Sequence, residues 1–404
     1  MSTTTLDPIE KLLEATVSGK SLIKNRTVLH HTFIPNNIHH RDLEQEKVTQ
    51  SLLPILKQSR PSNILIYGKP GTGKTLVVRR VLSKIQERVE KTNFPIKLIY
   101  GNSKEETTLY GLLVDFGRQL GLSEKELPTT GLSISEVFKR LLRIINKNSL
   151  NTVFIIDEID FLAHLVSKSK NDILYQLTRS NDRIKNGSLT LVGISNDLTF
   201  KDRLDPRVIS SLGEEEIVFT SYSVNQIHKI LEDRIQLAFV EGAVEESALN
   251  LCAAMAGREH GDARRAIDLL RVAGEIAERE QKEKVSEEHV RRASQKMEED
   301  KETAAIQSYP LHEKLLILAV MRAGGSSTGE IFSAYTKLCK SVRQKELTQR
   351  RMTQMLSEIE LSGIISGRIV HQGIHGRTKK FKLTISPETI KQTLKKDLIL
   401  EDLV

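Results

Sequence analysis

The chain has 404 residues, of which 39% are apolar and 28% charged, and this length predicts two or three domains with cores of their own. The formal net charge of +8 is concentrated in residues 309–404, which hold sixteen Lys or Arg against nine Asp or Glu and so indicate contact with a polyanion. No apolar run approaches the roughly 18 residues of a membrane-spanning helix, and two isolated cysteines exclude a disulfide framework or a cysteine zinc site.

Residues 1–36 are polar with scattered apolar positions, and they predict a loosely structured lead-in. From residue 63 onward, short β-branched runs alternate with helical patterns, which is typical of a parallel sheet covered on both faces. The expected strands are Asn63–Tyr67, Ile96–Tyr100, Val153–Asp157, Leu189–Ser195 and Ile217–Thr220, and the expected helices are Leu76–Val89, Thr108–Leu120, Ser135–Asn146 and Asn171–Ile184. The pattern predicts an α/β domain over residues 37–222.

After Ser223 the strand patterns end. Four amphipathic patterns predict a helical domain over residues 223–297, and they cover Val224–Val240, Glu245–Ala256, Gly261–Arg279 and Ser286–Lys296. Residues 298–308 are charged and lack a helical period, and Pro310 follows them, so they predict a linker to a third domain over 309–404.

Directly after the first strand comes the run GKPGTGKT, followed by a helix. This is the phosphate-binding loop in the strand–loop–helix setting that it requires. Its glycines let backbone N–H groups point at phosphate oxygens, and the helix N-terminus adds positive charge. We expect Lys74 to reach the β- and γ-phosphates and Thr75 to bind Mg²⁺. The candidate nucleotide ligands are Gly68, Pro70, Gly71, Thr72, Gly73, Lys74 and Thr75.

The run TVFIIDEID is an apolar strand that ends in acids. Asp157 is a candidate Mg²⁺ ligand through water, and Glu158 a candidate to polarise the attacking water. An acidic pair after a strand is common on protein surfaces, so the phosphate loop upstream is what favours the functional interpretation.

Three further polar residues follow. Asn196 ends the next strand and could orient the lytic water, although an Asn in a turn is the plainer interpretation. Arg207 could reach the γ-phosphate of a neighbouring molecule, and Arg264 opens a helix from which it could contact nucleotide. For each arginine a surface salt bridge is the alternative.

The basic third domain shows the pattern helix, helix, helix, hairpin of a winged helix–turn–helix. Its helices are expected at Leu311–Ala323, at Gly329–Cys339 and after a cap at Thr348, and its strands at Gly363–His371 and Arg377–Ile385. On the third helix the apolar positions form one stripe, which leaves Arg350, Arg351 and Gln354 for base edges in a major groove. Lys380 and Lys382 face outward on the second strand. The alternative is a winged helix that binds protein.

These elements, in this order, resemble an AAA+ ATPase, and more narrowly the archaeal origin recognition and cell-division-control initiator family. The residues that carry the resemblance are PNNIHHR at 35–41, GKPGTGKT, IIDEIDFL, GISND, LDPRV and GDARRAIDLLR. The resemblance implies that Asn196 is the first sensor, Arg264 the second sensor and Arg207 the arginine finger. It places His40 and Arg41 near the nucleotide base and Arg377 in a minor groove.

The stretch from Lys74 to Asp157 is too long for two plain strand–helix steps, and the surplus lies in residues 107–150. The resemblance implies that this is the initiator-specific helical insertion, which touches DNA in the family; a purely structural helix pair is the alternative.

The leading hypothesis is a cytoplasmic, nucleoid-associated replication initiator. It would bind double-stranded origin DNA, use ATP/ADP and Mg²⁺ as a slow regulatory switch, and recruit or load the replicative helicase, with paralogous initiator subunits as further partners. The rivals are a branch-migration motor, which also joins such a core to a winged helix, and a transcription regulator that binds nucleotide passively.

Overall fold

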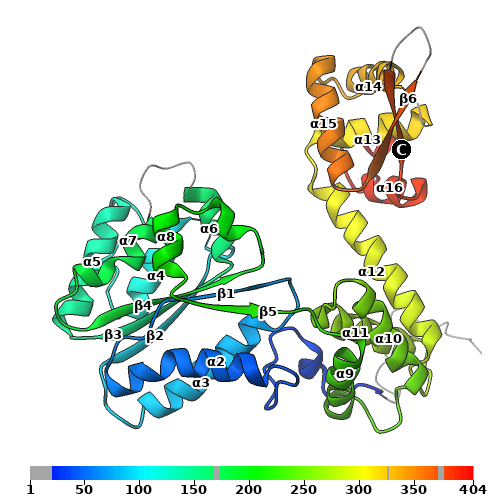
Figure 1. Cartoon of the computed structure of the whole chain (residues 1–404). Coiled ribbons are helices and arrows are strands. Elements are labelled where there is room, and N and C mark those ends of the chain that lie inside the picture. Colours follow the sequence, from blue (N-terminus) through cyan, green and yellow to red (C-terminus); the bar gives the residue numbers. More distant parts are fainter. Residues whose placement is uncertain (1–20, 107, 167–172, 325–326, 372–376, 404) are drawn as a thin grey trace, which may run out of the picture. The chain divides into compact units, whose positions relative to one another are not determined.

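The computed structural model describes residues 21–106, 108–166, 173–324, 327–371 and 377–403 (Figure 1). The chain divides into two compact units, residues 1–290 and 291–404. Each has a hydrophobic core of its own, so each is described by itself.

The first unit is built on a five-stranded parallel sheet with the order β2-β3-β4-β1-β5. The strands are β1 (Ile64–Gly68), β2 (Ile96–Asn102), β3 (Asn151–Asp157), β4 (Ser188–Ser195) and β5 (Glu215–Phe219). Every residue of β3 and β4 is buried, as the continuous apolar runs predict for strands covered on both faces. The five predicted strands are therefore confirmed, with ends displaced by at most two residues.

Helices cover both faces of this sheet (Figure 1). On one face lie α2 (Asp42–Leu52) and α3 (Lys74–Val89); on the other lie α4 (Leu109–Gln119), α5 (Ile134–Lys147), α6 (Ile159–Val166), α7 (Ile173–Thr178) and α8 (Pro206–Leu212). Alternate strand residues serve the two cores: Ile64 and Ile66 pack toward α3, and Leu65 packs with the α4–α5 side. The chain thus forms the expected α/β layers, and the surplus residues form a helix pair, α4 and α5.

One predicted helix ends earlier than expected. The pattern over Asn171–Ile184 contains only α7 and a 3-10 turn at Ser180–Asp182, while residues 171–172 lie outside the described part. The physical reason is Asn181, whose side-chain amide accepts from the N–H of Leu189 and donates to its carbonyl oxygen. Because Asn181 is held at the start of β4, residues 180–184 form the connection to that strand instead of continuing the helix.

A helical layer follows β5 and consists of α9 (Val224–Ala238), α10 (Glu246–Arg258) and α11 (Ala263–Arg279). The described part of the lead-in packs against it, so the prediction of a loose segment is wrong for residues 21–36. Ile23 forms a β-bridge with Phe239, and the 3-10 helix Arg26–Leu29 buries Val28 and Leu29. Scattered apolar positions in this segment are thus anchors on the helical layer.

The second unit is a winged helix. It contains α13 (Leu311–Ala323), α14 (Thr328–Ser341), α15 (Gln349–Leu361), the antiparallel strands β6 (Ile365–His371) and β7 (Arg377–Leu383), and α16 (Pro387–Leu394). The residues predicted as a linker, 298–308, are instead the second half of one helix, α12 (Glu287–Ser308). Charged residues hide the period there, but the buried Ile306 joins the core of the second unit.

Candidate nucleotide site and DNA-binding surface

The motif residues of the first unit meet at one edge of the parallel sheet. The phosphate loop follows β1, Asp157 ends β3, and Asn196 follows β4, which lies between those two strands. Because parallel strands present their carboxyl ends at the same edge, three segments far apart in sequence become neighbours. The edge therefore combines a phosphate loop with carboxylate and amide groups.

The loop has the backbone that its sequence requires. Gly71 and Gly73 have φ values of +72° and +90°, and Gly73 caps the N-terminus of α3. The Lys74 side chain is buried, and its Nζ donates to the carbonyl oxygens of Gly68 at 2.7 Å and Lys69 at 2.8 Å. Burial, together with Arg264, lowers the pKa of Lys74 to about 8. The ammonium thus lies inside the loop, where phosphate would offer stronger partners.

Thr75 and Asp157 form the candidate metal site. The Thr75 hydroxyl donates to Oδ2 of Asp157 at 2.9 Å, and Asp157 is buried. Two adjacent hard oxygen donors beside a phosphate loop suit Mg²⁺, which binds proteins through one or two such groups and keeps the rest of its shell as water and phosphate. The residues present therefore fit the metal.

Glu158 follows Asp157 with a φ of +53°, and its N–H donates to Oδ1 of Asp157 at 3.0 Å. Its carboxylate lies 3.9 Å from the Lys104 ammonium. Asn196 is half-buried, and its N–H donates to Asp160 at 3.3 Å. Both predicted water-handling groups thus follow adjacent strands.

The N-terminus of α11 touches the loop directly. A Cβ on Gly71 would lie 1.7 Å from Oδ1 of Asp262, and the N–H of Ala263 donates to the Gly71 carbonyl oxygen at 3.3 Å. Asp262 in turn caps α11 by accepting from the N–H of Arg264 at 2.8 Å. Gly71 is therefore needed for two reasons, its backbone and its contact with the helical layer, and only the first was expected from the motif.

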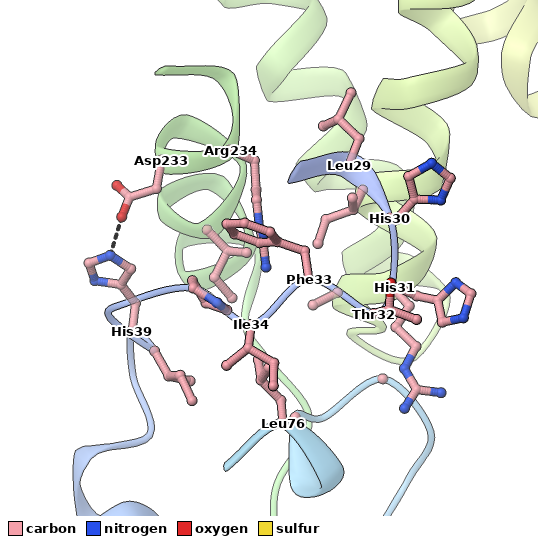
Figure 2. Close-up of a pocket in the computed structure, with 18 of the residues that line it drawn as sticks. Leu29, His30, His31, Thr32, Phe33, Ile34, His39, Leu76, Asp233 and Arg234 are labelled. Carbon is pink, nitrogen blue, oxygen red and sulfur yellow. Dashed lines mark hydrogen bonds and ion pairs between the residues drawn. The ribbon is translucent and has the colours of Figure 1, made fainter. Parts of the chain in front are cut away.

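A cavity of about 490 Å³ adjoins the loop (Figure 2). One wall comes from residues 29–41, here called the entry segment, and includes Phe33, Ile34 and His39. The opposite wall comes from α9 and α11 and includes Arg234 and Arg264. Figure 2 shows His39 hydrogen-bonded to Asp233, a contact between the entry segment and α9. The volume of the cavity and its mixed apolar and polar walls suit a nucleoside whose phosphates lie in the loop.

Gly71, Gly73, Thr75 and Arg264 line this cavity, whereas the predicted residues His40 and Arg41 do not. Its lining ends at His39, one residue before His40. Arg41 is buried, where its Nε donates to the Thr72 carbonyl oxygen at 2.9 Å and its guanidinium lies 3.9 Å from the centre of the Tyr222 ring. Arg41 thus ties the phosphate loop to the end of β5.

Arg207 also lies away from the cavity. Its guanidinium makes two hydrogen bonds to Asp205, at 3.0 and 2.9 Å, and lies 5.1 Å from the centre of the Tyr175 ring. Two-thirds of the side chain is exposed. The structure thus presents Arg207 on the surface of the first unit.

On the second unit, α15 buries the predicted stripe of Met352, Met355, Leu356 and Ile359. Arg350, Arg351 and Gln354 are exposed on the other side, and Thr348 caps the helix by accepting from the N–H of Arg351. On β7, Phe381 is buried, Lys382 is exposed and Lys380 half-buried; the Arg377 side chain lies outside the described part. The basic residues therefore gather on α15 and one side of β7.

Two contacts around the cavity could not be predicted from the sequence, Asp262 with Gly71 and Asp233 with His39. Aspartate directly before a helix is a capping signal, and it could have drawn attention to Asp262. Neither contact has a local pattern, because the partners are about two hundred residues apart.

Comparisons with known proteins agree with this arrangement. Residues 57–199 match the AAA domain family, 228–295 the Cdc6 AAA+ ATPase-type lid domain, and 304–393 the CDC6 C-terminal winged helix domain. The chain is 68% identical to an ORC1-type DNA replication protein of Cenarchaeum symbiosum, over 98% of this chain and 97% of that one. It is 41% identical to one of Pyrococcus abyssi, over 98% and 95%.

Among solved structures, the chain is similar to the Aeropyrum pernix ORC1 protein in complex with DNA. The TM-score is 0.84 and the identity 38%, over 95% of this chain and all of that one. Among the residues that the structure describes, no helix is long and apolar enough to cross a membrane.

Proposed function

The chain belongs to the ORC1-type DNA replication proteins of archaea, and we propose that it initiates replication by binding duplex origin DNA with ATP as a switch. The AAA domain, the lid and the winged helix supply the three parts that this function needs. In the proposal, the ATP-bound form recruits or loads the replicative helicase, alone or with paralogous initiator subunits.

At the nucleotide site, the loop amides and Lys74 bind the phosphates. Thr75 and Asp157 would hold Mg²⁺, and the metal would neutralise charge on the phosphate oxygens. Glu158 polarises the attacking water and Asn196 orients it. Arg264 contacts the phosphates from the lid, so ATP and ADP hold the lid differently. Arg207 acts on ATP bound by a neighbouring molecule.

At the entry segment, we assign His40 and Arg41 a supporting role. Arg41 fixes the loop through the Thr72 carbonyl oxygen, and His40 has a φ of +57°, which turns the chain into α2. Their contribution is to hold the nucleotide site in shape, since the cavity lining ends at His39.

At the DNA, Arg350, Arg351 and Gln354 read base edges in the major groove, whereas Lys380 and Lys382 meet phosphates and Arg377 enters a minor groove. The single observation that carries the ATP-switch proposal is the 2.9 Å contact of Thr75 with Asp157, in a loop that also touches the lid through Gly71.

Two variants test the nucleotide site. We expect Lys74→Ala to abolish ATP binding, because it removes the buried ammonium from the phosphate loop. We expect Glu158→Gln to bind ATP normally and lose hydrolysis, because Asp157 and Thr75 remain. The measurements are ATP affinity by calorimetry and single-turnover hydrolysis. Normal hydrolysis by both variants would show that the site is elsewhere.

A loading assay tests the initiator role. Helicase retained on origin-containing plasmid should require this protein, ATP and an intact Lys74. Protection of promoter DNA without any effect on helicase retention would instead favour a transcription regulator, and continuous hydrolysis stimulated by any DNA would favour a motor.

A further inference from the structure

Tyr100, on the edge strand β2, touches the candidate metal ligand. Its hydroxyl donates to Oδ2 of Asp157 at 2.6 Å, the same oxygen that accepts from Thr75. In the sheet register Tyr100 lies opposite Ile155, two residues before Asp157, so both side chains project from the same side. With the N–H of Glu158 on Oδ1, three donors hold the buried carboxylate in one orientation.

The tyrosine ring is itself held in place. The Arg79 guanidinium lies 4.5 Å from the ring centre, and Arg79 also lines the nucleotide cavity. In the contact with Asp157 the phenol of Tyr100 is the donor and the carboxylate oxygen is the acceptor.

The backbone of Tyr100 is held by α4, the first helix of the insertion. Because β2 is an edge strand, its outer N–H and carbonyl groups have no strand partner in the described sheet. The Gln119 amide of α4 takes both groups at Tyr100: it accepts from the N–H at 3.2 Å and donates to the carbonyl oxygen at 2.9 Å. One residue on, a Cβ on Gly101 would lie 2.5 Å from Leu112 and from Phe116, so α4 packs closely there.

We propose that Tyr100 is a positioning residue of the metal site, and that Gln119 makes the affinity for Mg²⁺ depend on the seating of α4 against β2. The proposal rests on the nucleotide function proposed above. Tyr100 does not bind nucleotide or metal; it acts through Asp157. A group that orients a metal-binding carboxylate typically changes metal affinity by about 10–100-fold when it is removed. Through Gln119 and Tyr100, α4 is connected to the metal ligand by hydrogen bonds.

The test separates metal affinity from nucleotide affinity in the full-length protein. ATP binding is measured in EDTA and then as a function of Mg²⁺, and Mn²⁺ binding in the presence of ADP is followed by electron paramagnetic resonance. We expect Tyr100→Phe to keep ATP affinity in EDTA within about twofold and to raise the half-saturating Mg²⁺ and Mn²⁺ concentrations about tenfold. The ring remains for Arg79, so only the hydroxyl contact is lost.

Tyr110→Phe is the matched control. It also removes a hydrogen-bonded tyrosine hydroxyl, but that hydroxyl donates to the Pro128 carbonyl oxygen inside the insertion. Its metal titration should be unchanged. A titration of Tyr100→Phe that coincides with the wild type overturns the proposal, whereas equal weakening in EDTA and in Mg²⁺ shows that Tyr100 supports the nucleotide pocket and overturns it too.

Gln119→Ala is the second variant. If Tyr100→Phe does not fold, Gln119→Ala still tests whether the position of Tyr100 affects metal affinity. It should shift the metal titration in the same direction and by a smaller factor, because the phenol stays but its backbone is released. No shift overturns the role of α4. If the wild type does not bind ATP, or binds it as Lys74→Ala does, the proposed function is contradicted. That result differs from an unchanged metal titration, which contradicts only the role of Tyr100.

Discussion

At the scale of single residues, Lys74 shows how the fold prepares a group for its ligand. The ammonium is buried and donates to two carbonyl oxygens, and its pKa of about 8 lies below the ordinary 10.5. Because the unfolded chain binds more protons than the folded one between these values, the stability contributed by Lys74 should rise with pH in that window. Phosphates would restore the charge that burial disfavours.

This gives a pH prediction for binding. Above about pH 8 the free protein loses the Lys74 proton, and ATP must restore it, so affinity should fall as the pH rises from 8 to 10 and binding should take up about one proton. Calorimetry at pH 9 in buffers of different ionisation enthalpy measures this uptake. Lys69→Ala is the control, since it removes an exposed amine of the same loop and should retain the uptake. Proton-neutral binding by the wild type would contradict the assignment.

Arg207 leads to a prediction about assemblies. Its guanidinium pairs with Asp205 and lowers the pKa of that carboxyl to about 2, so it is held on the surface and away from its own nucleotide cavity. Arg207→Ala should keep ATP affinity in dilute protein within about twofold and slow hydrolysis only at concentrations where molecules associate. Arg179→Ala is the control, because Arg179 lies over the same Tyr175 ring, at 5.8 Å. Loss of affinity in dilute Arg207→Ala would place the arginine in its own site.

What the sequence predicts at this scale depends on distance along the chain. Lys74 and Thr75 stand in one contiguous run, and Asp157 ends a recognisable strand, so their roles follow from local pattern. Tyr100 appears as one more aromatic residue on a strand. Its contact with Asp157 exists only because β2 and β3 pair in a particular register, which no local pattern contains.

At the scale of elements, one carboxylate joins α15 to the wing, which is the pair of strands β6 and β7. Glu360, on α15, accepts from the N–H of Gly367 on β6 at 3.1 Å and forms an ion pair with Lys379 on β7. A Cβ on Gly367 would lie 2.8 Å from the same carboxylate, so the approach is close. Glu360 therefore helps to fix the orientation of the wing against α15. It also neutralises the charge of Lys379.

Glu360→Gln should then have two effects of opposite sign. Affinity for random duplex should rise, because a negative charge is lost and Lys379 is freed, while the ratio of cognate to random affinity should fall, because the wing is held less firmly. Duplex titrations at two salt concentrations measure both. Glu388→Gln removes the same charge from an exposed position on α16, and it should raise both affinities alike. An unchanged ratio in Glu360→Gln would show that the tether does not orient the wing.

Element boundaries show where periodicity misleads. The stripe on α15 was predicted correctly because every fourth or third residue is apolar and packs on one core. The second half of α12 has too few apolar positions to show a period, yet helix propensity and Ile306 continue it to Ser308. After α7 the sequence misleads in the other direction. The helical pattern continues to Ile184, but the helix ends at Thr178 and Asn181 is bonded to Leu189 at the start of β4.

At the scale of the whole molecule, the division into two units has a consequence for how the DNA surface can be isolated. A fragment cut at Glu298 would begin in the middle of α12, whereas one from Arg291 keeps the unit of residues 291–404 together with the half of α12 that contributes Ile306 to its core. That unit also has most of the net charge of the chain. We therefore expect residues 291–404 to fold alone and to bind DNA.

The final prediction separates the two kinds of DNA contact in that fragment and in the full chain. Lys382→Ala should weaken binding to all duplexes alike and lower the slope of log K against log salt by about one, because one phosphate contact releases about one counterion. Arg350→Ala should cost about 1–3 kcal/mol on the cognate duplex only, because a forked guanidinium distinguishes bases. If the insertion of α4 and α5 also touches DNA, the full chain should show a steeper salt slope and a higher cognate preference than the fragment. If the fragment has no salt-dependent affinity for any duplex, the winged helix is not a DNA-binding domain. The positive charge of residues 309–404 would then indicate binding to a different polyanion.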